Sequence, residues 1–264
     1  LGGSLAKGRL GDYRLANAHL AVVIGAEAHG EGYSPYGGGI LDAAVPGGVT
    51  RFGKILMTFD LQVIRPTELV IVHDGSDGRA AVLEARGVEA RLPLLEALLP
   101  DYAVGEPRSL AVTVRYTLEP DARVLLVDYE LTNTGRETAQ ILLGVVGFLF
   151  GDGAEPFVPG YGYAAPPPGS TAPYYGAVGE DVGYLFGRKS TTLNFLVEYS
   201  GILAAQHSGE LDIAPGVTKR LGYALVVGPG DLSALQATWR EALAPDMTGH
   251  ITGRVIDGLG RPIA

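Results

Sequence analysis

Residues 110–135 read LAVTVRYTLEPDARVLLVDYELTNTG, and they carry the clearest indication of the fold. In its first half every second residue is large and apolar, which places on one side Leu110, Val112, Val114, Tyr116 and Leu118. After a turn at residues 119–122 the alternation resumes, and one side then carries Leu125, Val127, Tyr129 and Leu131. A period of two is typical of a strand with one buried and one solvated face, and Pro-Asp in the turn favours a chain reversal. The stretch therefore predicts an antiparallel β-hairpin.

Strand-like segments extend over most of the remaining chain. They occupy residues 10–24, 52–63, 68–73, 80–90, 183–186, 191–199, 202–205 and 220–227. Residues 138–150 are apolar at nearly every position, which predicts a strand that is buried on both faces. The glycine-rich residues 25–48 predict a structured loop or a set of turns.

One helix is expected near the C-terminal end of the chain. Asp231 is a good N-cap residue, and helical spacing then follows for Leu232, Leu235, Trp239 and Leu243. Many strands, few helices and turns at short intervals predict an all-β fold, a large antiparallel β-sandwich with this one short helix.

Composition excludes several classes of function. The chain has 264 residues and a formal net charge of −9, and it contains no run of Lys or Arg, so we expect no nucleic-acid partner. The longest apolar stretch, residues 141–150, is too short to span a membrane. Because there is no cysteine, disulfides, thiolate nucleophiles and cysteine-ligated zinc are excluded together.

The last sixteen residues differ in character from the rest. They resemble the opening of the carboxypeptidase regulatory-like domain, a small transthyretin-type β-sandwich, through Ile251, Gly253, Val255, Asp257, Gly260, Pro262 and Ile263. The resemblance implies a β-sandwich module at residues 1–247 and, at residues 248–264, either the start of a second sandwich or a strand that pairs with a neighbour. We therefore expect the chain to belong to a larger polypeptide.

A second resemblance covers about half the chain. The run from residue 112 to residue 147 resembles the galactose-mutarotase-like supersandwich, in which a strand that ends in a Thr-Asn-x-Gly element is followed by an apolar strand. The matching positions are Tyr129, Leu131, Thr132, Asn133, Thr134 and Gly135, with residues 211–216 as a later element. The resemblance implies a supersandwich-like fold.

The N-terminal half is similar to modules that precede regulatory-like domains in large bacterial envelope proteins. The similarity lies in residues 11–13, 15–17 and 36–42. It implies a non-catalytic module of an exported protein, placed in the cell envelope or outside the cell. Its partners would be other protein chains or other domains of the same polypeptide.

Mutarotases use two histidines and a glutamate to move protons on a sugar ring, which requires groups that titrate near neutral pH. His29 in the glycine-rich segment and His73 at a strand end are the candidate pair here, with Glu210 as a candidate base. None of these residues lies in a recognisable mutarotase motif, so we assign no catalytic residue. The alternative for both histidines is an ordinary surface or strand-end position.

Metal, phosphate and nucleophile motifs are missing from the sequence. There is no His-x-His, no His-Glu-x-x-His, no EF-hand loop and no Gly-x-Ser-x-Gly element. The Asp-Gly pairs at residues 74–78 and 152–153 are more typical of turns than of calcium ligands. We therefore expect neither a metal nor a cofactor.

Tyrosines cluster in two segments that are rich in glycine and proline, and they provide the remaining candidate ligand-binding residues: Tyr33, Tyr36, Tyr161, Tyr163, Tyr174 and Tyr175. Exposed aromatic rings can stack on a sugar or on a protein partner because they offer a large contact area at small entropic cost. The alternative is that these rings cover the edge of the sandwich and hydrogen-bond to the backbone.

Two hypotheses for the function follow. The first is a non-catalytic structural or adhesive module of an extracellular or cell-envelope protein, which assembles through its terminal strand by strand addition. The second is a carbohydrate-binding or mutarotase-like domain that holds a sugar near His29, Tyr33 and His73.

Overall fold

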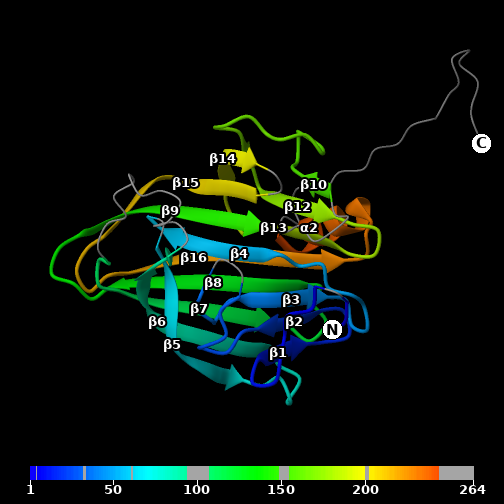
Figure 1. Cartoon of the computed structure of the whole chain (residues 1–264), viewed down its shortest axis with the longest axis horizontal. Helices are drawn as coiled ribbons and strands as arrows, with labels where there is room; N and C mark the ends of the chain where they lie inside the picture. The colour runs from blue at the N-terminus through cyan, green and yellow to red at the C-terminus, as the bar shows by residue number, and fades with distance from the viewer. Residues whose placement is uncertain are drawn as a thin grey trace, which may run out of the picture.

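The computed structural model describes residues 1–3, 5–31, 34–60, 62–93, 107–148, 155–199 and 202–243. In this part of the chain the strands form two sheets, and one helix follows them (Figure 1). The small sheet has the order β1-β2-β3 and contains β1 (Tyr13–Ala16), β2 (Ala21–Ile24) and β3 (Ile40–Ala44). The predicted all-β class with one short C-terminal helix is confirmed.

The large sheet is a 13-stranded ladder with the order β10-β12-β13-β16-β8-β7-β6-β5-β4-β9-β15-β14-β11. Its strands are β4 (Lys54–Phe59), β5 (Gln62–His73), β6 (Ala81–Arg91), β7 (Leu110–Leu118), β8 (Val124–Asn133), β9 (Ala139–Phe148), β10 (Glu155–Phe157), β11 (Thr171–Ala172), β12 (Tyr174–Val178), β13 (Gly183–Arg188), β14 (Leu193–Tyr199), β15 (Ile202–Ile213) and β16 (Thr218–Gly228). All strand pairs within it are antiparallel.

The predicted hairpin at residues 110–135 is the pair β7–β8, which runs in register from Leu110 opposite Asn133 to Thr117 opposite Leu126. Burial alternates along both strands as the sequence predicts. Val114 and Val127, for example, belong to the main apolar core. The hairpin lies in the middle of the ladder, between β16 and β6, so its register aligns the strands on both sides.

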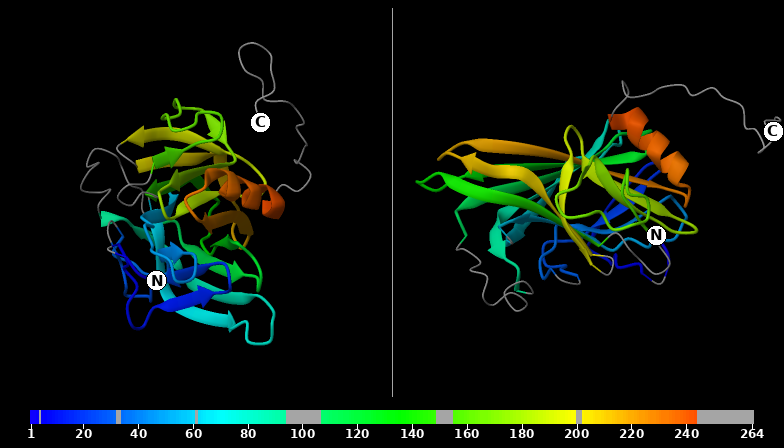
Figure 2. Two further views of the ribbon diagram at one scale, coloured as in Figure 1. Left: turned by 90° about the vertical axis from the view of Figure 1, so that its right-hand side faces the viewer. Right: turned by 90° about the horizontal axis from the view of Figure 1, so that it is seen from above.

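The ladder folds over on itself where β4 meets β5. These two strands pair only at Phe59 and Gln62, next to the turn that joins them. The hydroxyl of Tyr223 on β16 lies 3.7 Å from the sulfur of Met57 on β4, although four strands separate β16 from β4 in the ladder. The strands on either side of this fold therefore face each other as the layers of a sandwich (Figures 1 and 2), and β3 of the small sheet contacts β4 and β16.

The helix α2 (Leu232–Leu243) covers the outside of the sandwich (Figure 2). The backbone N–H of Ser233 donates to Oδ1 of Asp231 over 2.9 Å, so Asp231 is the predicted N-cap. Leu235 and Trp239 are buried against a second apolar cluster, on β8, β12, β13 and β16. The ring of Trp239 lies 4.7 Å from that of Tyr174, measured between centroids.

Three sequence-based expectations need correction. Residues 25–48 are not only loop, because Ile40–Ala44 forms β3 and pairs with β2. The strands expected at 52–63 and 68–73 are separated after Phe59 and not after residue 63. The second of them, β5, runs unbroken from Gln62 to His73 and accommodates Pro66 at a bulge. The strand at 138–150 is not buried on both faces: burial alternates along β9 over residues 139–145, and Leu142 is 40% exposed.

Residues 248–264 lie outside the described part of the chain, so the regulatory-like opening and the division into two domains stay predictions.

Candidate functional site

His29, one of the two candidate histidines, is buried and bonded to the start of β1. Its Nδ1 donates to the carboxylate of Asp12, at 2.7 Å from Oδ1 and 2.8 Å from Oδ2. Asp12 also accepts the backbone N–H groups of Ala26 and Arg9. Burial raises the pKa of Asp12, but these hydrogen bonds together outweigh that effect, so its pKa lies below the usual value. His29 thus connects the glycine-rich segment to the small sheet.

His73, the second candidate, closes the turn between β5 and β6. Its Nδ1 lies 2.9 Å from the carbonyl oxygen of Ala80, and its Nε2 lies 3.2 Å from a carboxylate oxygen of Asp77. Both ring nitrogens are therefore engaged within the turn that follows the strand.

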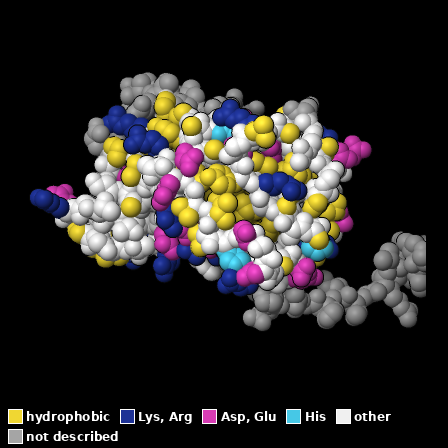
Figure 3. All heavy atoms as spheres, turned by 90° about the horizontal axis from the view of Figure 1, so that it is seen from below, with side chains coloured by type: hydrophobic (Ala, Val, Ile, Leu, Met, Phe, Trp, Pro, Cys, Tyr) yellow, Lys and Arg dark blue, Asp and Glu magenta, His cyan; other side chains and the backbone are white. Residues whose placement is uncertain are grey.

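The surroundings of the two histidines meet in one groove. A hollow of about 300 Å³ is lined by Asp12, the partner of His29, and by His73, together with residues of β1, β5 and β6. Apolar side chains gather beside acidic, basic and histidine side chains on the face that carries these strands (Figure 3). The side chain of Glu210, the candidate base, lies outside the described residues. The groove therefore contains His73 and Asp12, and Asp12 is the carboxylate to which His29 is hydrogen-bonded.

The predicted tyrosines fall into two groups. Tyr174 and Tyr175 are buried, and burial raises the pKa of both phenols. Tyr36 donates its hydroxyl to the carbonyl oxygen of Arg91 over 3.1 Å. Tyr33 lies outside the described residues. Only Tyr161 and Tyr163, among the described candidates, are exposed, at 37% and 52%.

Tyr161 and Tyr163 project from a tight turn after β10. Val158 and Gly162 exchange two backbone hydrogen bonds of 2.9 Å each, which close this turn. Gly160 and Gly162 have φ angles of 85° and 63°, a left-handed conformation that favours glycine. The ring of Tyr163 meets that of Phe157 edge to face at 5.7 Å between centroids. The two exposed tyrosines are therefore presented by a preformed turn. We define residues 157–163 as the aromatic turn.

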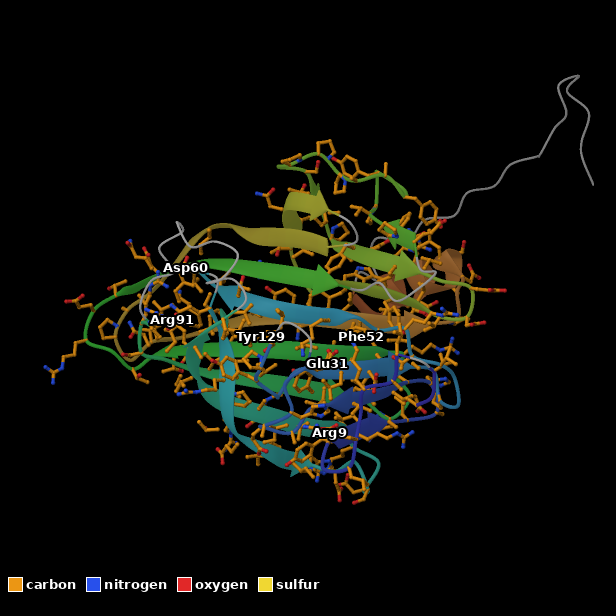
Figure 4. The ribbon with its side chains drawn as sticks, viewed as in Figure 1. Arg9, Glu31, Phe52, Asp60, Arg91 and Tyr129 are labelled. Atoms are coloured by element: carbon orange, nitrogen blue, oxygen red, sulfur yellow. The ribbon has the colours of Figure 1, made fainter. Side chains whose placement is uncertain are left out.

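A small cavity between the sandwich layers contains residues that the sequence reasoning missed. It measures about 40 Å³ and is lined by residues 34–40 and by side chains of β4, β5, β7, β8 and β13. Lys54, Tyr116 and Tyr129 are its titratable members besides Tyr36. In Figure 4 the side chains of Tyr129 and Glu31 lie in the central part of the molecule, near the strands that line the cavity. The only sequence signal was a lysine at the start of an apolar strand.

The glycine-rich segment forms a fixed wall of this cavity. Tyr116 donates its hydroxyl to the carbonyl oxygen of Gly38 over 2.6 Å. The backbone N–H of Gly37 donates to the carbonyl oxygen of Glu27 over 3.0 Å. A Cβ atom on Gly37 would lie 1.6 Å from the carbonyl oxygen of Ala26, so only glycine fits there.

Within the described ranges, no three His, Asp or Glu side chains come close enough together to hold a metal ion. No helix in the same ranges is both long and apolar enough to cross a membrane.

No protein family and no curated protein matches the sequence. Solved structures do match. Slr1438 from Synechocystis sp. PCC 6803 has a TM-score of 0.52 at 12% identity, over 88% of this chain and 100% of that one. A protein in glycosyl hydrolase family 38 from Enterococcus faecalis has a TM-score of 0.53 at 14% identity, over 94% of this chain but only 34% of that one. A galactose mutarotase-like protein from Lactobacillus casei ATCC 334 has a TM-score of 0.47 at 11% identity, over 83% of this chain and 100% of that one.

The first two matches show that the chain shares their fold. At these identities the likeness concerns the fold alone.

Proposed function

We propose that the chain is a non-catalytic β-sandwich module of a carbohydrate-related protein and that it contacts carbohydrate through the aromatic turn. The observation that carries this proposal is the exposure of Tyr161 and Tyr163 on a hydrogen-bonded turn. The apolar C–H faces of a sugar ring pack on aromatic rings of this kind, and the phenol hydroxyls remain free to hydrogen-bond to sugar hydroxyls. Because the turn is preformed, little entropy is lost on binding.

The geometry of the candidate acid and base groups favours binding over catalysis. His29 is bonded to Asp12, and His73 is bonded within its own turn. The interlayer cavity of about 40 Å³ is far smaller than the roughly 300–1,000 Å³ of typical small-molecule sites. The occurrence of this fold within a glycosyl hydrolase family 38 protein supports a carbohydrate-related setting.

A glycan array with the full chain tests the proposal, followed by titration calorimetry on the glycans that bind. We expect Tyr161→Ala and Tyr163→Ala to weaken binding about tenfold each, the size of effect expected when an aromatic contact is lost. Tyr163→Phe keeps the ring and should retain most of the affinity. Binding that is unchanged in the double alanine variant would contradict the role of the aromatic turn, and an array with no binding would contradict a carbohydrate ligand.

Polarimetry separates this function from a mutarotase activity. We expect the interconversion of glucose and galactose anomers to proceed at the uncatalysed rate in the presence of the protein. A rate that rises in proportion to protein concentration, and falls in His73→Gln, would instead favour catalysis in the groove lined by Asp12 and His73.

Export to the cell envelope, and pairing of residues 248–264 with another chain or domain, remain further parts of this proposal. They are supported by the resemblances at both ends of the sequence. Deletion of residues 249–264 followed by light scattering tests the pairing, because the proposal requires a smaller assembly. An unchanged mass would remove the pairing and leave the carbohydrate contact untouched.

A further inference from the structure

One side of the sandwich is open, and each layer presents an unpaired strand edge there. In the described part of the chain, β1 is the outermost strand of the small sheet and pairs with β2 alone. β5 pairs with β6 from Gln62 to His73, but on its other edge it meets β4 only at Phe59 and Gln62. In Figure 1, β1 and the ends of β5 and β6 lie at the same lower side of the molecule. The backbone groups of an unpaired edge can pair with a strand of another molecule.

The groove of about 300 Å³ lies between these two edges. One wall consists of residues 12–15, and the other contains Ile71, His73, Asp74 and residues 81–83. Successive side chains of a strand point to opposite faces, so what consecutive residues share toward one hollow is the edge of the strand. The groove therefore follows the free edge of β1, opposite the end of the β5–β6 hairpin.

The free edge of β5 is protected over only part of its length. Pro66 has no backbone N–H, and the N–H of Leu69 donates to Oε1 of Glu27 over 2.9 Å. Beyond Leu69 the strand contains no proline, and Ile71 and Val72 are 60% and 47% exposed. Apolar side chains lie between charged ones on this side of the molecule (Figure 3). An edge with exposed apolar side chains favours association with another strand.

Two charges of opposite sign lie on opposite walls of the groove without an ion-pair partner. Arg14 of β1 is exposed and makes no hydrogen bond or ion pair within the described residues. Asp74, which directly follows β5, is also exposed. Its carboxylate accepts the backbone N–H of Ser76 over 2.9 Å and makes no ion pair in the same part of the chain. The remaining carboxylate of the lining and its histidine are already bonded within the protein.

We propose that the open side of the sandwich binds the same side of a second copy of this chain, as a two-fold dimer. A two-fold axis along the groove places β1 of each copy beside β5 of the other. Because Arg14 and Asp74 lie on opposite walls, this axis brings Arg14 to the partner's Asp74, and Asp74 to the partner's Arg14. An axis across the groove would instead place like edges and like charges together. Charge complementarity therefore selects the first arrangement.

The contact combines two contributions. Backbone pairing along the edges and burial of Ile71 and Val72 supply affinity, whereas the two reciprocal ion pairs fix the partner and its orientation. The aromatic turn and residues 249–264 take no part, so this inference is independent of the proposed function.

Sedimentation equilibrium of the full chain over a range of concentrations tests the proposal. We expect a reversible step between monomer and dimer, and a chain that stays monomeric up to about 1 mM would overturn the proposal. Ile71→Lys places a charge on the free edge and should abolish this step. Because Ile71 is exposed, the variant should fold normally, which circular dichroism verifies. A dimer as stable in this variant as in the wild type would also overturn the proposal.

Charge exchange tests the predicted pairing directly. Arg14→Asp and Asp74→Arg should each raise the dimer dissociation constant at least about tenfold, because each change places like charges together at two points. An equimolar mixture of these two variants should regain the wild-type affinity as a heterodimer, since each acidic position then meets a basic one. Single variants that dimerise like the wild type, or a mixture no tighter than either variant, would overturn the proposed arrangement.

Two controls complete the experiment. Arg136→Asp, at an exposed position in the turn between β8 and β9, changes the net charge as much as Arg14→Asp and should leave the dimer unchanged. A chain without residues 249–264 should dimerise with the same dissociation constant. Loss of the dimer on this removal, with no effect of Arg14→Asp, would assign the contact to the terminal segment and overturn the proposal.

Discussion

Nδ1 of His29 lies 2.7 Å from Oδ1 of Asp12, and their side chains are 8% and 2% exposed. This pair joins the glycine-rich segment to the start of β1, and it sets the relation between the small sheet and the wall of the interlayer cavity. The segment is also held by the Tyr116 hydroxyl, which donates to the carbonyl oxygen of Gly38, and by the carboxylate of Glu27, which accepts the backbone N–H of Leu69.

Replacement of Asp12 by asparagine should lower the free energy of unfolding at neutral pH by about 1–3 kcal/mol. The buried carboxylate accepts hydrogen bonds from His29 and from two backbone N–H groups, and an amide would make these bonds weaker. The pKa of Asp12 is lowered in the folded state, so its carboxylate stabilises the fold above the unfolded-state value. That contribution is lost as pH falls from about 4 through the folded-state pKa. Urea unfolding measured at pH 7 and pH 3 checks this. A variant with the same acid sensitivity as the wild type would contradict it.

Substitution of Gly37 by alanine should destabilise the fold by about 1–3 kcal/mol, because the added Cβ would lie 1.6 Å from the carbonyl oxygen of Ala26. Gly39, two residues later, provides the matched control, since a Cβ there would meet no atom within 4 Å. We expect Gly39→Ala to change stability by less than about 0.5 kcal/mol. Denaturant unfolding of both variants checks the prediction, and similar losses would show that the segment is not closely packed.

Asp231→Ala should cost about 1 kcal/mol through loss of the hydrogen bond to the N–H of Ser233, whereas Asp231→Asn should retain most of the stability. The chain has one tryptophan, and it lies in α2, so the fluorescence of Trp239 reports directly on the docking of the helix. An alanine variant whose fluorescence and unfolding midpoint equal those of the wild type would contradict the capping role.

Leu125→Ala should cost about 2–5 kcal/mol, because Leu125 is fully buried in the main core. Thr113 on the neighbouring strand points to the opposite, partly solvated face, and Thr113→Ala should change stability by less than about 0.5 kcal/mol. Thermal unfolding followed by circular dichroism compares the two variants. Equal losses would be incompatible with the alternation on which the hairpin was predicted.

Elements with a local pattern could be predicted from the sequence. The hairpin β7–β8 and the capped helix α2 both follow from the spacing of apolar side chains over consecutive residues, because a strand or helix repeats its burial at a fixed period. The strand β3 could not be predicted from the sequence, because glycines surround it and its partner β2 lies about twenty residues earlier in the chain.

Which side chains meet in space depends on how the strands pack in three dimensions. The ladder reverses direction between β4 and β5 and so brings Tyr223 to Met57. The burial of Lys54, which is only 5% exposed, likewise depends on segments that are distant in the sequence. The same holds for His29 and Asp12, and for the contrast between exposed Tyr163 and buried Tyr175 within one tyrosine-rich region. Periodicity specifies which face of a strand is apolar, but the burial and pairing of a polar group depend on segments that are distant in the sequence.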